Sequence, residues 1–368
     1  MTTICFSQES RKIFLSISKE FSSKTDISIL YIGPENTYFS DFLKTLKTDF
    51  NYSGYFTVHT LYSTENFNIS DMENLIKKNE FVCVIKVINK KEIDVQWIDA
   101  GNSERFKNRY SLLPFSSDTA HMVCDDIVYW FTGKKSIAKT KIAYVSNVAG
   151  TPQIFIIDYD GNNKIQITNS PHIKDFPRFS PEHKLIYISY KSGTPTPVLF
   201  DANRGQEIPI FSFPGLTVFA DISPIGPEMA IISSKDGNPE IYIASFNGEI
   251  LNRLTYSSSI ETSPSFSSDG DYIAFTSDRS GKPQVYIMDK NGNNVKKISY
   301  GYDYAISPAW SPDGKYICYL VRKQGVFQMV LYDVLAKKNT LLPTKTGWAE
   351  SVSWAPDSRH MVFAKKQN

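Results

Sequence analysis

The fold of this chain is decided by Pro308–Leu320, whose sequence PAWSPDGKYICYL predicts a strand, a tight turn and a second strand. Its central Ser-Pro-Asp-Gly has the chemistry of a turn. The proline presets φ, the aspartate bonds to its own backbone, and the glycine accepts a positive φ. The aromatic and β-branched run that follows suits a half-buried strand. One such hairpin is common in proteins, but this one recurs along the chain.

Four further segments carry a related motif. Measured at the residue equivalent to Ser311, the copies lie 43 or 44 residues apart. A fixed period of this size, with about four strands per unit, predicts the blades of a β-propeller. The β-branched runs and the frequent turn residues exclude helical repeats of similar period. The other copies are Pro177–Pro181, Ala220–Gly226, Pro264–Gly270 and Val352–Asp357.

The two ends of the repeat region indicate how the ring closes. Between them lie four complete units. Ile142–Thr168 matches only the last three strands of a unit, and Glu350–Ala364 supplies two strands. Joining these ends would close the ring and leave no sheet edge exposed. The count fits either five blades with a spare strand or six blades of which one is incomplete.

The first 133 residues follow a different pattern. Helical spacing in Ser40–Phe50 and Asp118–Phe131 alternates with strand-like runs, including a hairpin from Phe81 to Asp99. Mixed helices and strands followed by strands alone indicate two separately packed domains. We therefore expect an N-terminal α/β domain over 1–133, a short basic linker over 134–141 and an all-β propeller over 142–368.

Composition excludes several classes of function. The 368 residues include 40 basic and 38 acidic ones without a basic block, so nucleic-acid binding has no electrostatic footprint. No apolar run of about 18 residues could span a membrane, and the first 20 residues lack the features of a signal peptide. The four cysteines lack a Cys-x-x-Cys pair and the five histidines are scattered. We therefore expect buried free thiols, no metal site and no cofactor.

The order of these features resembles the TolB family. The resemblance covers essentially the whole chain and rests on the Ser-Pro-Asp-Gly repeats together with Asn51–Phe56, Val82–Asp99, Ala120–Val128 and Thr140–Val145. It implies a six-bladed propeller that serves as a non-catalytic adaptor of the Tol-Pal system, supporting outer-membrane integrity and constriction at division. It also implies a periplasmic location, with the signal peptide already removed.

Two protein partners are implied by the same resemblance, and the chain itself would be a monomer. A Pal-like lipoprotein would dock at the mouth of the central channel, which strand one of each blade lines, and Tyr and Trp are frequent in binding hot spots. Thr262 matches a threonine that the family uses there, and Leu216 stands where well-known members have a histidine. The expected contacts are Asp175, Phe176, Leu216, Val218, Phe219, Thr262, Ser263, Tyr302, Tyr304, Trp348 and Glu350.

A TolA-like inner-membrane protein would bind the N-terminal segment through Lys12, Ile13, Phe14 and Leu15. These residues could equally form an ordinary edge strand, and the mouth residues could merely plug the channel. The alternative function is a propeller hydrolase or lyase with its site in the channel. It would need ionisable clusters, whereas the strand-one residues are mainly Phe, Trp, Ile and Ser. No Gly-x-Ser-x-Gly motif is present, and no catalytic residue is expected.

Overall fold

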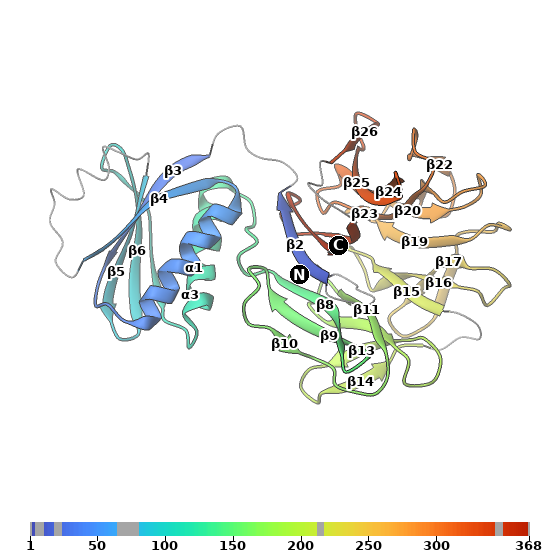
Figure 1. Ribbon diagram of the computed structural model, residues 1–368, viewed down its shortest axis with the longest axis horizontal. Helices are drawn as coiled ribbons and strands as arrows, with labels where there is room; N and C mark the ends of the chain where they lie inside the picture. The colour runs from blue at the N-terminus through green and yellow to red at the C-terminus, as the bar shows by residue number, and fades with distance from the viewer. Residues whose placement is uncertain are drawn as a thin grey trace. The chain divides into compact units, whose positions relative to one another are not determined.

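The computed structural model describes residues 2–3, 11–17, 24–64, 81–211, 217–342 and 349–366, without the side chains of 2–3, 11–17, 60–64, 219–220 and 365–366. The chain forms two compact units (Figure 1), one of residues 17–140 and the other of residues 1–16 with 141–368. The described residues among the first 16 therefore belong with the propeller. The sequence predicts them in the N-terminal domain, because strand pairing with residues more than a hundred positions away leaves no local signal.

The unit of residues 17–140 is a five-stranded sheet with two described helices. The strand order is β4-β3-β5-β6-β7, with β4 and β5 parallel to β3 and the remaining pairs antiparallel. Buried Trp97 of β6 lies 5.8 Å from Phe50 of α1 between ring centres, which fastens this helix to the sheet. The bounds are β3 Thr25–Ile32, α1 Thr37–Ser53, β4 Phe56–Thr64, β5 Phe81–Asn89, β6 Glu92–Asp99, β7 Glu104–Ser111 and α3 Ser116–Thr132.

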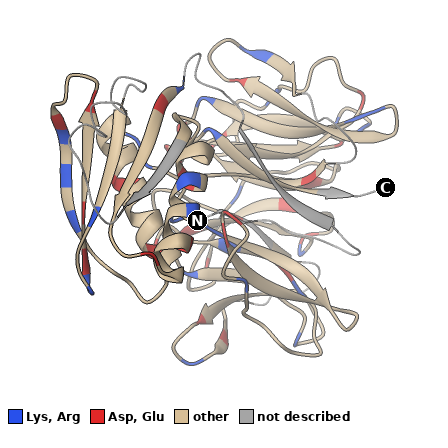
Figure 2. Ribbon diagram, turned by 60° about the vertical axis from the view of Figure 1, so that its left-hand side comes forward, with Lys and Arg blue, Asp and Glu red and all other residues tan. Residues whose placement is uncertain are grey.

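Charges of both signs are mixed over this unit (Figure 2). On the outer strands, Arg109 Nε lies 2.6 Å from Asp94 Oδ1, and Arg105 Nε lies 2.5 Å from Asp99 Oδ2. Arg105 and Arg109 of β7 are thus each paired with an acidic residue of β6. Among the described residues, no helix has the length and apolar character needed to cross a membrane.

The other unit contains five four-stranded sheets and one three-stranded sheet. Their orders are β1-β8-β9-β10, β11-β12-β13-β14, β15-β16-β17-β18, β19-β20-β21-β22, β23-β24-β25-β26 and β2-β28-β27. The bounds are β1 Thr2–Thr3, β2 Arg11–Ile17, β8 Lys141–Val148, β9 Thr151–Asp158, β10 Ile165–Gln166, β11 Lys174–Phe179, β12 Leu185–Ser189, β13 Thr196–Asp201, β14 Gln206–Pro209, β15 Thr217–Ile222, β16 Glu228–Ser233, β17 Glu240–Ser245, β18 Ile250–Arg253, β19 Glu261–Phe266, β20 Tyr272–Ser277, β21 Gln284–Asp289, β22 Lys296–Lys297, β23 Ala305–Trp310, β24 Tyr316–Lys323, β25 Val326–Asp333, β26 Lys338–Leu341, β27 Ala349–Trp354 and β28 His360–Lys366.

The N-terminal segment closes this ring in two places. Strand β1 pairs in parallel with β8, placing Thr2 opposite Ile142 and Thr3 opposite Ala143, and so supplies the innermost strand that this blade lacked. Strand β2 lies beside β28 in the three-stranded sheet. The innermost strands β1, β11, β15, β19, β23 and β27 contact one another in a closed cycle. Among the described residues the structure has five four-stranded blades and a sixth of three strands, which matches the second of the two counts predicted from the sequence.

The repeated hairpins have the predicted turn chemistry. In the quoted stretch, Ser311 Oγ donates to Asp313 Oδ1 at 2.7 Å, and the amide of Gly314 donates to the Ser311 carbonyl at 2.9 Å. Gly314 has a φ of 73°, the conformation for which the turn needs glycine. The cysteine expectation is confirmed for Cys83, Cys124 and Cys318, which are buried and free, while Cys5 lies outside the described residues.

Candidate functional site: the central channel

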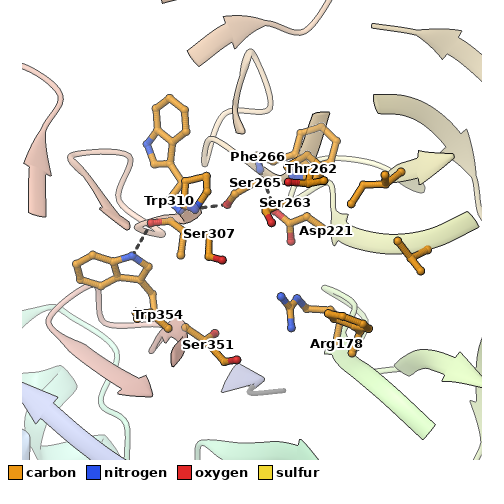
Figure 3. Close-up of a pocket in the computed structure, with 18 of the residues that line it drawn as sticks. Arg178, Asp221, Thr262, Ser263, Ser265, Phe266, Ser307, Trp310, Ser351 and Trp354 are labelled. Atoms are coloured by element: carbon orange, nitrogen blue, oxygen red, sulfur yellow. Dashed lines mark hydrogen bonds between the residues drawn. The ribbon is translucent and has the colours of Figure 1, made fainter. Parts of the chain in front are cut away.

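A β-bulge interrupts five of the inner strands. In β19 the register with β20 shifts between Thr262 and Ser265, and β11, β15, β23 and β27 shift at the equivalent place. Inside the bulge, Ser263, Ser307 and Ser351 have φ between 52° and 54°. A non-glycine residue in this left-handed region stores strain, and a bulge re-aims its side chain. Three neighbouring blades thereby present a hydroxyl-bearing residue to the channel (Figure 3).

These strands surround a cavity of about 490 Å³. Its walls combine hydroxyl groups with aromatic rings, including those of Phe266, Trp310 and Trp354. Trp310 Nε1 donates to the carbonyl of Gly314 in its own hairpin at 3.1 Å. Trp354 Nε1 instead donates to the carbonyl of Ala309 in the neighbouring blade at 2.9 Å. Indole rings held at their nitrogen atoms form a preorganised wall.

Two charged side chains reach the cavity from neighbouring inner strands. Arg178 comes from β11 and Asp221 from β15, and Figure 3 shows them across the opening from Trp354 and Ser351. Arg178 Nη1 donates to the carbonyl of Pro177 at 3.1 Å. Burial raises the pKa of the Asp221 carboxyl, and the charge of Arg178 offsets part of that rise. The channel wall therefore combines one basic and one acidic side chain with hydroxyl groups, and Ser263 and Ser265 lie beside Asp221.

Hydrogen bonds between blades hold this wall in shape. The amide of Phe266 donates to Asp221 Oδ2 at 2.8 Å, and the amide of Trp310 donates to Ser265 Oγ at 3.1 Å. Each bond joins a backbone amide on the inner strand of one blade to a side chain on the inner strand of the preceding blade. In both cases that side chain stands two residues before the residue equivalent to Ser311. A ligand at this surface would meet groups whose positions are already ordered, which reduces the entropy lost on binding.

The structure brings part of the predicted partner-binding set together. Phe176, Val218, Thr262 and Ser263 line the cavity, and Phe176 is 40% exposed. Asp175 and Glu350 belong to inner strands but are not among the residues that line the cavity. The Tyr302 ring packs against Tyr319, with 6.4 Å between ring centres, and the Tyr304 ring packs against Phe327, with 5.8 Å between ring centres. Outside the described residues or side chains lie Leu216, Trp348, Phe219, Lys12, Ile13, Phe14 and Leu15.

Sequence reasoning missed the two channel charges. Arg178 and Asp221 each stand two residues before the residue equivalent to Ser311 in their own copy of the repeat. The later copies have Ser265, Ala309 and Ser353 at this position. Aligning the copies at this position would have shown that only the first two carry charge. The commonest residue types on the first strand of each blade are Phe, Trp, Ile and Ser, so a description by residue type does not show these two charged residues.

Comparison with known proteins gives the wider context. The family model for the TolB beta propeller domain matches residues 129–368. "Protein TolB homolog" from Chlorobium chlorochromatii (strain CaD3) is 32% identical over 154 residues, which cover 41% of this chain and 34% of the relative. "Tol-Pal system protein TolB" from Geobacter metallireducens (strain ATCC 53774 / DSM 7210 / GS-15) is 45% identical over 65 residues, covering 18% of this chain and 15% of the relative.

A solved structure of TolB from Acinetobacter baumannii superposes with a TM-score of 0.76 over 97% of each chain, at 23% sequence identity. At that identity the likeness shows the fold. The chain spans about a third of the length of the first curated relatives it matches. Because the family model covers well over half of the present sequence, the chain belongs to the TolB β-propeller family, whose curated members include Tol-Pal system proteins.

Proposed function

We propose that this chain is a non-catalytic, monomeric adaptor of a Tol-Pal system in the periplasm, where it supports outer-membrane integrity and constriction at cell division. The observation that carries the proposal is a closed TolB-type propeller whose channel wall is aromatic, hydroxyl-bearing and ordered by bonds between blades. Such a wall suits recognition of a folded protein, since binding energy concentrates in aromatic and arginine side chains surrounded by polar groups.

The proposed partner at the channel mouth is a Pal-like peptidoglycan-associated lipoprotein. Phe176, Thr262 and Ser263 line the cavity, and Phe176 offers an exposed ring that a partner could cover. Arg178 and Asp221 add a basic and an acidic side chain to the same wall. Charged groups of a partner that complement this pair would contribute orientation more than affinity.

The proposed second partner is a TolA-like inner-membrane protein, which would bind the N-terminal segment. Among the described residues, β1 pairs with β8 at two positions, and β2 lies beside β28 at the edge of its sheet. Release of β1 and β2 would leave a free strand to pair with another protein's sheet edge. The N-terminal segment would then have a docked and a released state. Binding of the TolA-like protein or of the Pal-like lipoprotein would shift the populations of these two states, and so change the binding of the other partner.

Catalysis in the channel is the competing function. It would require ionisable groups that converge on a substrate, whereas the charged groups among the described lining residues are Arg178 and Asp221. Asp221 Oδ2 already accepts the amide of Phe266, and the other polar side chains are hydroxyls or indoles. These features favour binding over turnover.

Capture from detergent-solubilised envelopes of the source organism tests both partners. The full chain should retain a Pal-like lipoprotein and a TolA-like protein, each identified by mass spectrometry. Thr262→Arg should weaken Pal-like capture at least about tenfold because it places a bulky charge in the mouth. Leu335→Arg, at an exposed turn outside the cavity lining, should have no effect.

An excess of a peptide with the sequence of residues 1–18 should displace the TolA-like protein and leave the lipoprotein bound. The peptide is preferable to a deletion, because deletion would also remove β1 and β2 from the ring. Failure of the full chain to retain either protein would overturn the proposal. So would turnover of a sugar or peptide substrate that is lost in Asp221→Asn.

A further inference from the structure

A second cavity, of about 550 Å³, lies in the blade formed by β11 to β14. Its walls are the loop of residues 167–172 and side chains of all four strands, and it shares no lining residue with the channel cavity. A hollow of this size with a few convergent polar groups is typical of a small-molecule site. Nothing in the proposed adaptor role uses it.

The floor of this cavity is a buried ion pair. Lys174 is 0% exposed, and its Nζ lies 2.6 Å from Glu207 Oε1 and donates to Ser189 Oγ at 2.8 Å. Tyr187 Oη donates to Glu207 Oε1 at 3.1 Å, and Ser189 Oγ donates to Glu207 Oε2 at 2.8 Å. The pKa of Glu207 stays below its usual value, since these donors outweigh the effect of burial. Removing such an ion pair from water is unfavourable before its attraction is counted.

The fold itself does not require a lysine here. In the register of the inner hairpins, Lys174 faces Ser189, and the equivalent pair of the next blade is Thr217 with Ser233. The pair Ala305 and Val321 shows that an entirely apolar solution also fits this architecture. The charge at Lys174 is therefore a property of this blade and not of the repeat.

The cavity keeps hydrogen-bond donors that the contacts within the described structure do not use. Both carboxylate oxygens of Glu207 already accept bonds from the floor. Lys174 uses two of its three N–H groups within the described structure, since its acceptors are Glu207 and Ser189. Lys191 at the rim is exposed and has no ion-pair partner among the described side chains. Two cations with spare donors beside one carboxylate that already accepts three bonds favour a negatively charged ligand.

The loop that forms the opposite wall is held in place before any ligand arrives. Gln153 is 1% exposed, and its Nε2 donates to the carbonyls of Ser170 and His172 at 2.9 and 3.1 Å. Its Oε1 accepts the amide of Ser170 at 3.2 Å. Because this wall is preorganised, binding would lose little conformational entropy.

We propose that this cavity binds the oxyanion, a carboxylate or a phosphate, of a small molecule. Lys191 and Lys174 supply the positive charge. The rings of Tyr187 and Phe200, whose centres lie 6.5 Å apart, border the space for its apolar part. The site rests on these contacts alone and does not depend on the adaptor role.

Amide chemical shifts of the full chain, followed by NMR during titration, test this proposal. Sodium phosphate and sodium acetate are the probes, each compared with sodium chloride at equal ionic strength. Saturable shifts are expected for Asn169, Ser170 and His172 and for residues 205–207. Tighter binding of phosphate would identify a phosphorylated ligand, and tighter binding of acetate a carboxylate. Shifts that rise linearly and equally with all three salts would indicate an adventitious ion only and overturn the proposal.

Variants assign the effect to named side chains. Lys191→Gln should weaken probe binding about tenfold, as expected for loss of one charge-assisted contact. Lys235→Gln is the matched control from the next blade, since Lys235 Nζ is held by Asp236 at 2.8 Å, and it should leave binding unchanged. Lys174→Met combined with Glu207→Leu removes the pair without leaving an orphan charge, and should abolish binding while thermal unfolding stays cooperative. Unchanged binding in that double variant would exclude Lys174 from the site.

Discussion

The blades β19–β22 and β23–β26 share one backbone plan but differ in their interiors. At the start of the inner strand, Glu261 faces Ser277 in the first, and Ala305 faces Val321 in the second. All four residues are 0% exposed. Glu261 Oε1 accepts hydrogen bonds from Ser277 Oγ and Arg279 Nη2, each at 3.0 Å. The side chains of Ala305 and Val321 have no polar group that needs a hydrogen-bond partner. The repeat thus specifies strand register and turns, and leaves buried polarity free to vary.

The same two blades also differ in how they are tied to the next one. Ser265 of β19 accepts the amide of Trp310 through its side chain. The equivalent residue of β23 is Ala309, which has only its backbone carbonyl to offer, and the indole of Trp354 binds that carbonyl. A contact between blades persists although its chemistry has changed. Positions where the blades diverge are therefore where individual function can arise without loss of the ring.

The largest effect is expected from Glu261→Ala, which breaks the polar interior of β19–β22. Ser277 and Ser257 lose an acceptor, and Arg279 loses its ion-pair partner. Because Arg279 is 28% exposed and can be partly rehydrated, we expect a loss of about 2–3 kcal/mol, measured as a shift of the urea midpoint.

Adding Ser277→Val to that variant copies the pair of β23–β26 and should recover part of the loss, since a well-packed apolar pair can replace a buried polar one. If Glu261→Ala leaves the urea midpoint unchanged, the polar network contributes nothing to stability, and the contrast between the two blades is only one of composition.

Gly292→Ala should have the next largest effect, at the outer turn of β19–β22. Gly292 has a φ of 84°, and a Cβ there would lie 2.2 Å from the carbonyl oxygen of Leu254 in the preceding blade. The clash and the left-handed backbone together should destabilise the protein by about 2 kcal/mol in thermal unfolding. Leu335→Ala, in the corresponding turn of β23–β26, alters a residue that is 94% exposed and should change stability by less than about 0.5 kcal/mol. Equal effects of the two would contradict the close contact at Gly292.

The smallest effect is expected from Asp221→Asn, at the link that enters β19–β22. Burial raises the folded-state pKa of Asp221, so its contribution to stability is present at low pH and is lost as pH rises through that pKa. Asparagine keeps an acceptor for the amide of Phe266 and has no such loss. The stability of the variant relative to the parent should therefore increase with pH, by less than about 1 kcal/mol.

For Asp269→Asn we expect the stability of the variant relative to the parent to change with pH in the opposite direction. Ser267 holds the pKa of Asp269 below its usual value, so this contribution is present at neutral pH and is lost as pH falls through the folded pKa. The variant should therefore lose stability relative to the parent as pH rises. Urea unfolding at several pH values checks both variants, and parallel trends would refute the assignment at Asp221.

Much of the architecture could be predicted because its signals are local. The turn at Asp313 and Gly314 and the helix around Phe50 follow from neighbouring residues and their spacing. For the candidate site, the structure gives positions and leaves partner binding a prediction. Thr262 and Ser263 line the channel cavity, whereas the Tyr302 ring packs against Tyr319. Spacing identified the loop before each inner strand, but not the direction in which its side chains point.

By itself the sequence determined that the chain contains a propeller, since a period of 43 or 44 residues with turn chemistry at each copy has few other solutions. Only the tertiary structure decided how the ring closes, because pairing of Thr2 with Ile142 depends on two segments that meet after folding. It also decided that Arg178 and Asp221 share one wall. Bulges in the inner strands shift side chains out of simple alternation, so facing direction is a property of the folded sheet.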